Sequence, residues 1–234
     1  MNITGHDIRW VLITVLVLII SVALHEFGHA IMATWLGDDT PRRQGRVTLN
    51  PIAHADPIGT VLLPIVAGLY NAHALATGAR PMGGLGWGKP VQWNPSRIHR
   101  KWRMSTAQIL VAVAGPAMNV VLALVVAIVH CILMKAHVLA YDSDINAILF
   151  YAVGTNFVLF FFNLVPAPPL DGGHVAEGLM PYKHRSKFES YARYGVFIVG
   201  AIIFIPVLSR IFQIPAQFCT EHVYKALFAL LGVS

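Results

Sequence analysis

Two histidines and a glutamate lie within five positions of one another in the stretch "LHEFGHAIMATWL", residues 24–36. In an α-helix, residues four apart lie on the same face, so His25 and His29 can turn two imidazole nitrogens toward one ion. Glu26 follows the first histidine, where its carboxylate can reach a water near that ion without acting as a ligand. This H-E-x-x-H spacing is typical of zinc sites in which the glutamate is a general base.

The same three side chains directly follow the apolar run "VLITVLVLIISVA", residues 11–23. Five-residue matches of this kind also arise by chance in soluble proteins. A charged side chain inside a membrane, however, costs about 2.5–3.5 kcal/mol even on the most lenient insertion scale, so it is expected to serve a function. We therefore predict one catalytic Zn²⁺ ion at this helix.

A catalytic zinc ion needs a third protein ligand and an open position. No histidine or glutamate follows the pair at the short spacing of other zinc peptidases, so the third ligand must be distant in sequence. The best candidate is in "FFNLVPAPPLDGGHV", residues 161–175, where three prolines must end a helix. Asp171 follows this break, and the two glycines after it let backbone and ion approach closely. His174 is a rival candidate for this ligand. If it does not bind the ion, we expect it to face the loop or to support a ligand without contacting the ion.

A polar residue also interrupts a third apolar segment. Asn119 ends the motif "AGPAMN", residues 114–119, and "VVLALVVAIV" follows it. The small residues of the motif favour close helix packing. Asn119 is expected either to bond neighbouring helices together or to orient the substrate and stabilise an oxyanion.

The composition is that of an integral membrane protein. Of 234 residues, 56% are hydrophobic and 12% charged, whereas soluble domains are about 25% charged. The formal net charge of +6 matches the lysine and arginine excess of cytoplasmic membrane loops, so no nucleic-acid partner is expected. The two cysteines form no CxxC pair, which indicates neither a disulfide framework nor a zinc knuckle.

Apolar segments of about 20 residues predict the membrane spans. The predicted spans are residues 8–36, 104–135, 145–165 and 191–208, with a weaker one at 57–76 and a last one at 211–231 that Pro215 and the polar residues 220–222 break. Basic residues follow the first span, precede the span at 104 and follow the span that ends at 165, which assigns these three loops to the cytoplasm. Residues 57–76 must then enter and leave on the cytoplasmic side, so a re-entrant or interfacial segment is predicted there. The glycine- and proline-rich residues 82–95 form either an interfacial loop or a flap or strand edge beside the site.

These segments predict an all-α polytopic membrane protein. We expect a bundle of about five to six transmembrane helices, with a re-entrant or interfacial segment and a short irregular or β loop after the first helix. One membrane-embedded protease domain is expected to occupy residues 1–234, with a core at 8–175 and C-terminal helices at 190–232. The expected location is a bacterial cell (inner) membrane.

Several motifs in this order resemble the site-2 protease family of intramembrane zinc metalloproteases. They are "HEFGH", "GPAMN" and "NLVPAPPLDGG", with "LNPIAHADPIGT" (49–60) also similar, and the resemblance covers about residues 25–174. It implies a short form without the PDZ or CBS domains that other members carry. It also implies a zinc ion within the membrane and nearer its cytoplasmic side.

The resemblance implies a role for each residue of the motifs. His25, His29 and Asp171 would bind zinc, Glu26 would be the base, and Asn119 and Asn163 would help shape the site. For His54, in "AHADP", three roles are open. It is expected to support a metal ligand without contacting the ion, to act as a gate residue at the active site, or to pack within its own loop.

The expected function is hydrolysis of a peptide bond in or near a transmembrane segment of a membrane-protein substrate. The alternative is a catalytically inactive metal-binding scaffold or a metal transporter. A transporter is expected to show internal repeats and polar residues across the whole bilayer, whereas polar groups here cluster at one depth. The expected partners are the transmembrane substrate and the lipid bilayer, and the sequence does not indicate an oligomeric state.

Overall fold

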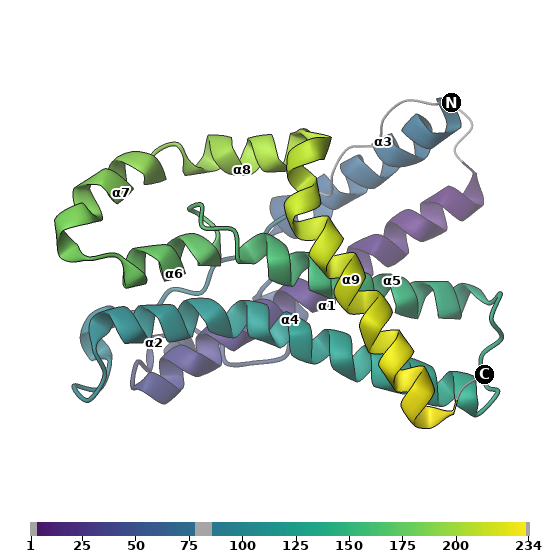
Figure 1. Ribbon diagram of the computed structural model, residues 1–234, viewed down its shortest axis with the longest axis horizontal. Helices are drawn as coiled ribbons and strands as arrows, with labels where there is room; N and C mark the ends of the chain where they lie inside the picture. Colours follow the sequence, from purple (N-terminus) through teal and green to yellow (C-terminus); the bar gives the residue numbers. More distant parts are fainter. Residues whose placement is uncertain (1–3, 78–85, 233–234) are drawn as a thin grey trace.

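The computed structural model describes residues 4–77 and 86–232. None of these residues lies in a β-strand, so the predicted all-α class is confirmed and the loop after the first helix is irregular rather than β. The α-helices are α1 (Gly5–Leu36), α2 (Thr40–Arg43), α3 (Leu63–Thr77), α4 (Met104–Lys135), α5 (Asp144–Asn163), α6 (Asp171–Leu179), α7 (Arg185–Ala192), α8 (Gly195–Phe204) and α9 (Pro206–Leu231) (Figure 1). Short 3-10 or π-helical turns are Pro51–Ala53, Pro57–Leu62, Pro95–Arg97 and Tyr182–His184.

Helix α1, which carries the histidine pair, has strong signals at both ends. The Thr4 hydroxyl accepts a hydrogen bond from the Asp7 N–H, and the Asp7 carboxylate accepts one from the Thr4 N–H, which is a capping box. The helix ends at Gly37, whose φ of 115° is left-handed. Its 32 residues span about 48 Å at 1.5 Å per residue, which exceeds the hydrocarbon thickness of about 30 Å.

Among the described residues, three helices are long and apolar enough to cross a membrane: α1, α4 and α5. Helices α8 and α9 form a fourth if the pair, which is bent by 74°, is counted as one broken span. The described residues therefore supply three to four candidate spans, where the sequence predicts about five to six. The predicted span at 191–208 is divided because α8 has only 10 residues and the chain is extended at Ile205, before a proline.

The predicted break in the last apolar segment is wrong. Helix α9 runs over 26 residues with Pro215 inside it. Helices in membrane proteins tolerate proline where neighbouring groups compensate the lost bond. Here α9 crosses α4 and α5 and packs against both (Figure 1).

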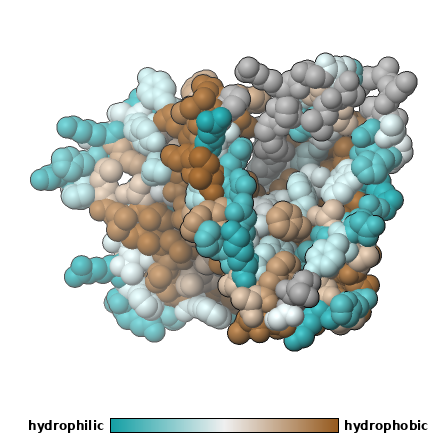
Figure 2. Space-filling view, turned by 45° about the vertical axis from the view of Figure 1, so that its right-hand side comes forward, coloured by the Kyte–Doolittle hydropathy of each residue, from teal (hydrophilic) through white to brown (hydrophobic). Residues whose placement is uncertain are grey.

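Helix α4 is the centre of the fold, since α1, α5, α6 and α9 all pack against it. One buried cluster joins the side of α4 that faces α5 and α9. Its members are Ala123, Ala127, Cys131, Val153, Phe157, Ala216 and Tyr224. Large apolar side chains such as Leu12, Val125 and Ile132 are at least half exposed, and Figure 2 shows broad apolar areas on the molecular surface. This apolar exterior fits a protein surrounded by lipid.

The segment predicted to be re-entrant returns to the place where it begins. The chain runs through residues 57–62 and then α3, where Gly68 lies against Val11 near the start of α1. The Trp87 N–H then bonds to the Gly59 carbonyl at 3.1 Å, and the Lys89 N–H bonds to the His54 carbonyl at 2.9 Å. These contacts agree with a segment that enters and leaves on one side.

Candidate metal centre

Helix α1 brings its two histidines together on one face. The Nε2 atoms of His25 and His29 are 3.1 Å apart, and the rings meet edge to face with centroids 4.7 Å apart. Both side chains are largely buried. The four-residue spacing thus produces the local geometry that it predicts.

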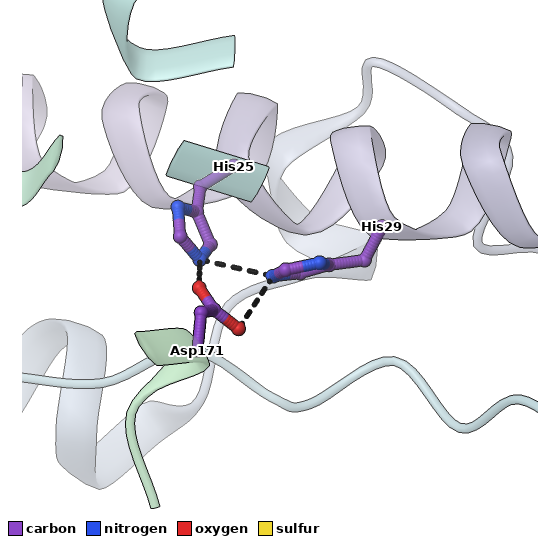
Figure 3. A group of neighbouring side chains, drawn as sticks. All are labelled: His25, His29 and Asp171. Carbon is purple, nitrogen blue, oxygen red and sulfur yellow. Dashed lines mark hydrogen bonds and ion pairs between the residues drawn. The ribbon is translucent and has the colours of Figure 1, made fainter. Parts of the chain in front are cut away.

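The third predicted ligand comes from the start of α6. The Asp171 carboxylate lies 3.1 Å from His25 Nε2 and 3.3 Å from His29 Nε2. Figure 3 shows the two rings and the carboxylate pointing toward one another from α1 and α6. One ligand atom of each residue lies within 4.8 Å of the others, which is close enough for a single ion.

Hydrogen bonds behind the rings determine which imidazole nitrogen carries the proton. His29 Nδ1 lies 2.7 Å from the Val111 carbonyl, which can only accept, so this nitrogen donates. His25 Nδ1 lies 2.7 Å from Asn119 Oδ1, which also accepts. In the neutral form of the two rings, the single proton is then on Nδ1 and each Nε2 atom keeps a free lone pair.

The donor set therefore fits a cation. Two Nε2 atoms and a carboxylate converge, and in the neutral form of the rings none of the three can donate a hydrogen bond to the others. Accordingly, Asp171 Oδ2 is buried and has no hydrogen-bond partner. Such a cluster of lone pairs needs a positive charge, and two imidazoles with one carboxylate are a typical protein ligand set for catalytic Zn²⁺.

Two glycines let α1 and α4 approach closely at this point. A Cβ atom on Gly115 would stand 2.8 Å from His25 Nε2 and closer still to His29 Nε2. A Cβ atom on Gly28, between the two histidines, would stand 2.5 Å from the Ala114 carbonyl oxygen. The imidazoles thus lie directly against the α4 backbone, which explains the small residues of both motifs.

The glycines after Asp171 have a different role from the predicted one. Gly172 lies against the Leu164 carbonyl, and a Cβ atom on Gly173 would stand 2.6 Å from the Pro168 nitrogen. They therefore allow α6 to fold back onto the proline-rich turn, rather than allowing an ion to approach the backbone. Because Asp171 is the first residue of α6, this tight turn determines where its carboxylate points.

Glu26 lies beside the three ligands and outside their cluster. Its Oε2 accepts a hydrogen bond from the Val91 backbone N–H at 3.0 Å. Val91 belongs to residues 86–97, which we call the covering segment. For residues 82–95 the sequence left open an interfacial loop or a flap or strand edge beside the site. The Val91 contact favours a position beside the site for residues 86–95. Residues 82–85 lie outside the described residues.

Two acidic residues after α1 anchor the covering segment. Asp38 is fully buried, and its carboxylate accepts hydrogen bonds from the backbone N–H groups of Thr40 and Asn94. Arg97 donates to the Asp39 carboxylate at 2.6 Å. The hydrogen bonds from Arg97 and from Arg43 outweigh the desolvation and hold the pKa of Asp39 below its usual value.

Asn119 is fully buried, and its contacts favour the structural alternative over direct contact with a substrate. Its Oδ1 faces His25, and its Nδ2 donates to the Ser21 carbonyl at 3.2 Å and to Asn156 Oδ1 at 3.0 Å. We therefore interpret Asn119 as a residue that positions His25. Ser21 and Asn156 escaped the sequence analysis, although both are polar residues in apolar helices, which is the signal that singled out Asn119.

The contacts of the remaining predicted residues are to groups other than the three ligands. Asn163 Nδ2 donates to the Leu159 carbonyl within its own helix. His54 is fully buried, with Nε2 2.9 Å from the Thr48 carbonyl, which favours loop packing. His174, the rival ligand, is exposed and lies 3.8 Å from the Glu177 carboxylate.

Comparisons with known proteins agree with the motifs. The sequence model of Peptidase family M50 matches residues 131–206. YwhC of Bacillus subtilis, which is named as a zinc metalloprotease, is 37% identical over 198 residues that cover 83% of this chain and 80% of that protein. Rip2 of Mycolicibacterium smegmatis, with the same description, is 30% identical over 196 residues, or 83% of this chain and 67% of that protein. No solved structure matches the chain.

Proposed function

The chain belongs to peptidase family M50, the site-2 protease family of zinc metalloproteases, and from this premise we propose that it hydrolyses a peptide bond in or near a transmembrane segment of another membrane protein. It is a multi-pass membrane protein, and zinc is the catalytic metal of its family. The observation that carries the proposal is the convergence of His25, His29 and Asp171 beside Glu26, on a helix that is long and apolar enough to cross the bilayer.

We assign the zinc ligands to His25 Nε2, His29 Nε2 and the Asp171 carboxylate. When bound, zinc supplies Lewis acidity, which lowers the pKa of a water toward about 7 and polarises a carbonyl group. The Glu26 carboxylate takes a proton from the attacking water and passes it to the nitrogen of the leaving amine. The Val91 N–H donates to one oxygen of this carboxylate, which orients the side chain for the role we propose.

The substrate must be unwound before it can react, because a membrane helix satisfies its backbone hydrogen bonds internally. The covering segment runs past Glu26 without regular secondary structure between residues 86 and 94. We propose that the unwound substrate strand pairs with the backbone of this segment. Such pairing supplies part of the hydrogen bonding that the substrate loses.

The position of the site along α1 indicates its depth. His29 and His25 are 7 and 11 residues from Leu36, which is about 10 and 17 Å along the helix axis. The basic loop that follows α1 assigns this end to the cytoplasmic side. We therefore place the active site within one membrane-embedded domain of a bacterial inner-membrane protein, nearer the cytoplasm.

The experiment that tests this function compares purified wild type with Glu26→Gln in detergent and in liposomes, against single-span peptides. We expect Glu26→Gln to lower cleavage by about 10²–10⁴-fold, because the proton acceptor is lost. Zinc content is expected to persist, since a glutamine oxygen still accepts from Val91. Glu221→Gln on α9 is the matched control and should cleave as the wild type does.

A chelator should also stop cleavage by the wild type, and added zinc should restore it. Cleavage by Glu26→Gln at the wild-type rate would refute the proposed base. Cleavage by a zinc-free protein would refute the metal mechanism. If the zinc-loaded wild type cleaves no peptide, the alternative of a metal-binding scaffold or transporter is favoured.

A further inference from the structure

We propose that Asn156 of α5 is a positioning residue for the metal centre, which acts through Asn119 to keep His25 Nε2 free as a ligand. The inference rests on the proposed function, because it concerns the metal site which that function requires. Helix α5 supplies no ligand itself, yet Asn156 is almost fully buried and lies between α1 and α4.

The chain of contacts starts at a backbone carbonyl. Asn156 Nδ2 donates to the Ala152 carbonyl at 2.9 Å and to Ser21 Oγ at 3.0 Å. The Ala152 carbonyl can only accept, so it must face the amide nitrogen of Asn156. Asn156 Oδ1 is thereby turned toward α4.

Asn156 and the Ser21 carbonyl together determine the orientation of Asn119. Asn119 Nδ2 has two acceptors, Asn156 Oδ1 and the Ser21 carbonyl. With both amide protons directed there, Asn119 Oδ1 faces His25 Nδ1. Two backbone carbonyls, one on α1 and one on α5, therefore orient both buried amides.

A reversed amide at Asn119 would damage the metal site. Its Nδ2 would face His25 Nδ1, which would then have to accept a hydrogen bond. The single proton of the neutral ring would move to Nε2, the atom that faces Asp171, and Nε2 could no longer bind a metal ion. Asn156 thus favours the one tautomer of His25 that can act as a ligand.

The size of the effect follows from residues that support metal ligands in general. Loss of such a partner typically lowers metal affinity or activity by about 10- to 100-fold. We expect Asn156→Leu, which removes the acceptor but keeps a similar volume, to weaken zinc binding by this factor. Ser21→Ala should have a smaller effect, because it removes only the hydroxyl and leaves the Ser21 carbonyl in place.

The test is zinc affinity of the purified, metal-free full-length chain, measured by competition with a chromophoric chelator. The absorption spectrum of the cobalt-substituted protein reports ligand geometry independently of catalysis. Thr220→Val is the matched control, because its buried hydroxyl also bonds to a carbonyl four residues earlier, on α9 away from the site. It should bind zinc as the wild type does.

A double variant separates positioning from general destabilisation. If Asn156 acts through Asn119, then Asn156→Leu should weaken zinc binding no further in an Asn119→Ala background. Asn156→Asp keeps an oxygen opposite Asn119 Nδ2 and should bind zinc more tightly than Asn156→Leu, so the inference stays testable if the leucine variant does not fold.

Wild-type affinity and an unchanged cobalt spectrum in Asn156→Leu would overturn the inference, as would fully additive losses in the double variant. Either result leaves the proposed function intact. A wild-type chain that binds no zinc would instead overturn the proposed function, and the role of Asn156 with it.

Discussion

Gly115→Ala is expected to abolish zinc binding without preventing folding. The added Cβ would stand 2.8 Å from His25 Nε2, whereas ordinary contact begins at 3.4 Å. His25 Nε2 must therefore shift by about 0.6 Å, and His29 Nε2, which lies closer, must shift further. Metal–ligand distances tolerate only about 0.2 Å, so both imidazoles leave the positions that a zinc ion requires.

We expect zinc affinity to fall at least about 100-fold, which corresponds to about 2.7 kcal/mol. Alanine is favoured over glycine inside a helix by up to about 1 kcal/mol, so the substitution should not harm α4 itself. The assay is chelator competition, with circular dichroism and size exclusion to verify the fold. Gly154→Ala on α5 is the control, because its Cβ would meet its nearest neighbour at an ordinary 3.9 Å.

Wild-type zinc affinity in a folded Gly115→Ala variant would refute the reasoning. It would mean that the imidazoles do not lie against the α4 backbone in the metal-bound protein. Loss of zinc in both glycine variants would point to a general effect on helix packing instead.

Two further predictions concern the elements around the site. Gly172→Ala should lower both thermal stability and zinc affinity, because its Cβ would collide with the Leu164 carbonyl and displace Asp171; a folded variant with unchanged zinc affinity would contradict this. Asp39→Asn should lower the thermal midpoint slightly at pH 7. The pKa of Asp39 is lowered by Arg97, so its stabilising effect is present above about pH 4 and is lost as the pH falls through the folded-state value. Thermal scans of both proteins should therefore converge at low pH, and a difference that persists there would refute this role.

Local patterns were the most reliable guide. The spacing of His25 and His29 predicts a shared face, because helix geometry alone relates residues four apart. The proline-rich turn singles out Asp171, because three prolines within four positions remove several backbone donors and end helix α5 before residue 166. The bounds of α4 agree with the sequence-based range of residues 104–135, because a continuous apolar run fixes the length of this helix even with Pro116 inside it.

Patterns that depend on neighbours were less reliable. The apolar composition of residues 191–208 predicts one span. In the structure the short helix α8 ends at Phe204, and the extended backbone at Ile205 divides this segment. Pro215 predicts a break in the last helix. In the structure α9 packs against α4 and α5 and continues through this proline. Whether a helix breaks at such residues depends on the contacts that compensate the lost hydrogen bond.

The amino-acid sequence by itself determined the membrane setting and the helical class, which follow from composition and hydropathy, and it singled out the proposed ligands and base through one helical spacing and one proline-rich turn. Only the tertiary structure decided what surrounds them. Asn156 contacts Asn119, which is 37 positions away. Gly115 approaches the two imidazoles from 86 and 90 positions away, and Val91 bonds to Glu26 across 65 positions. No local pattern relates residues so distant, because their distance is determined by how the helices pack.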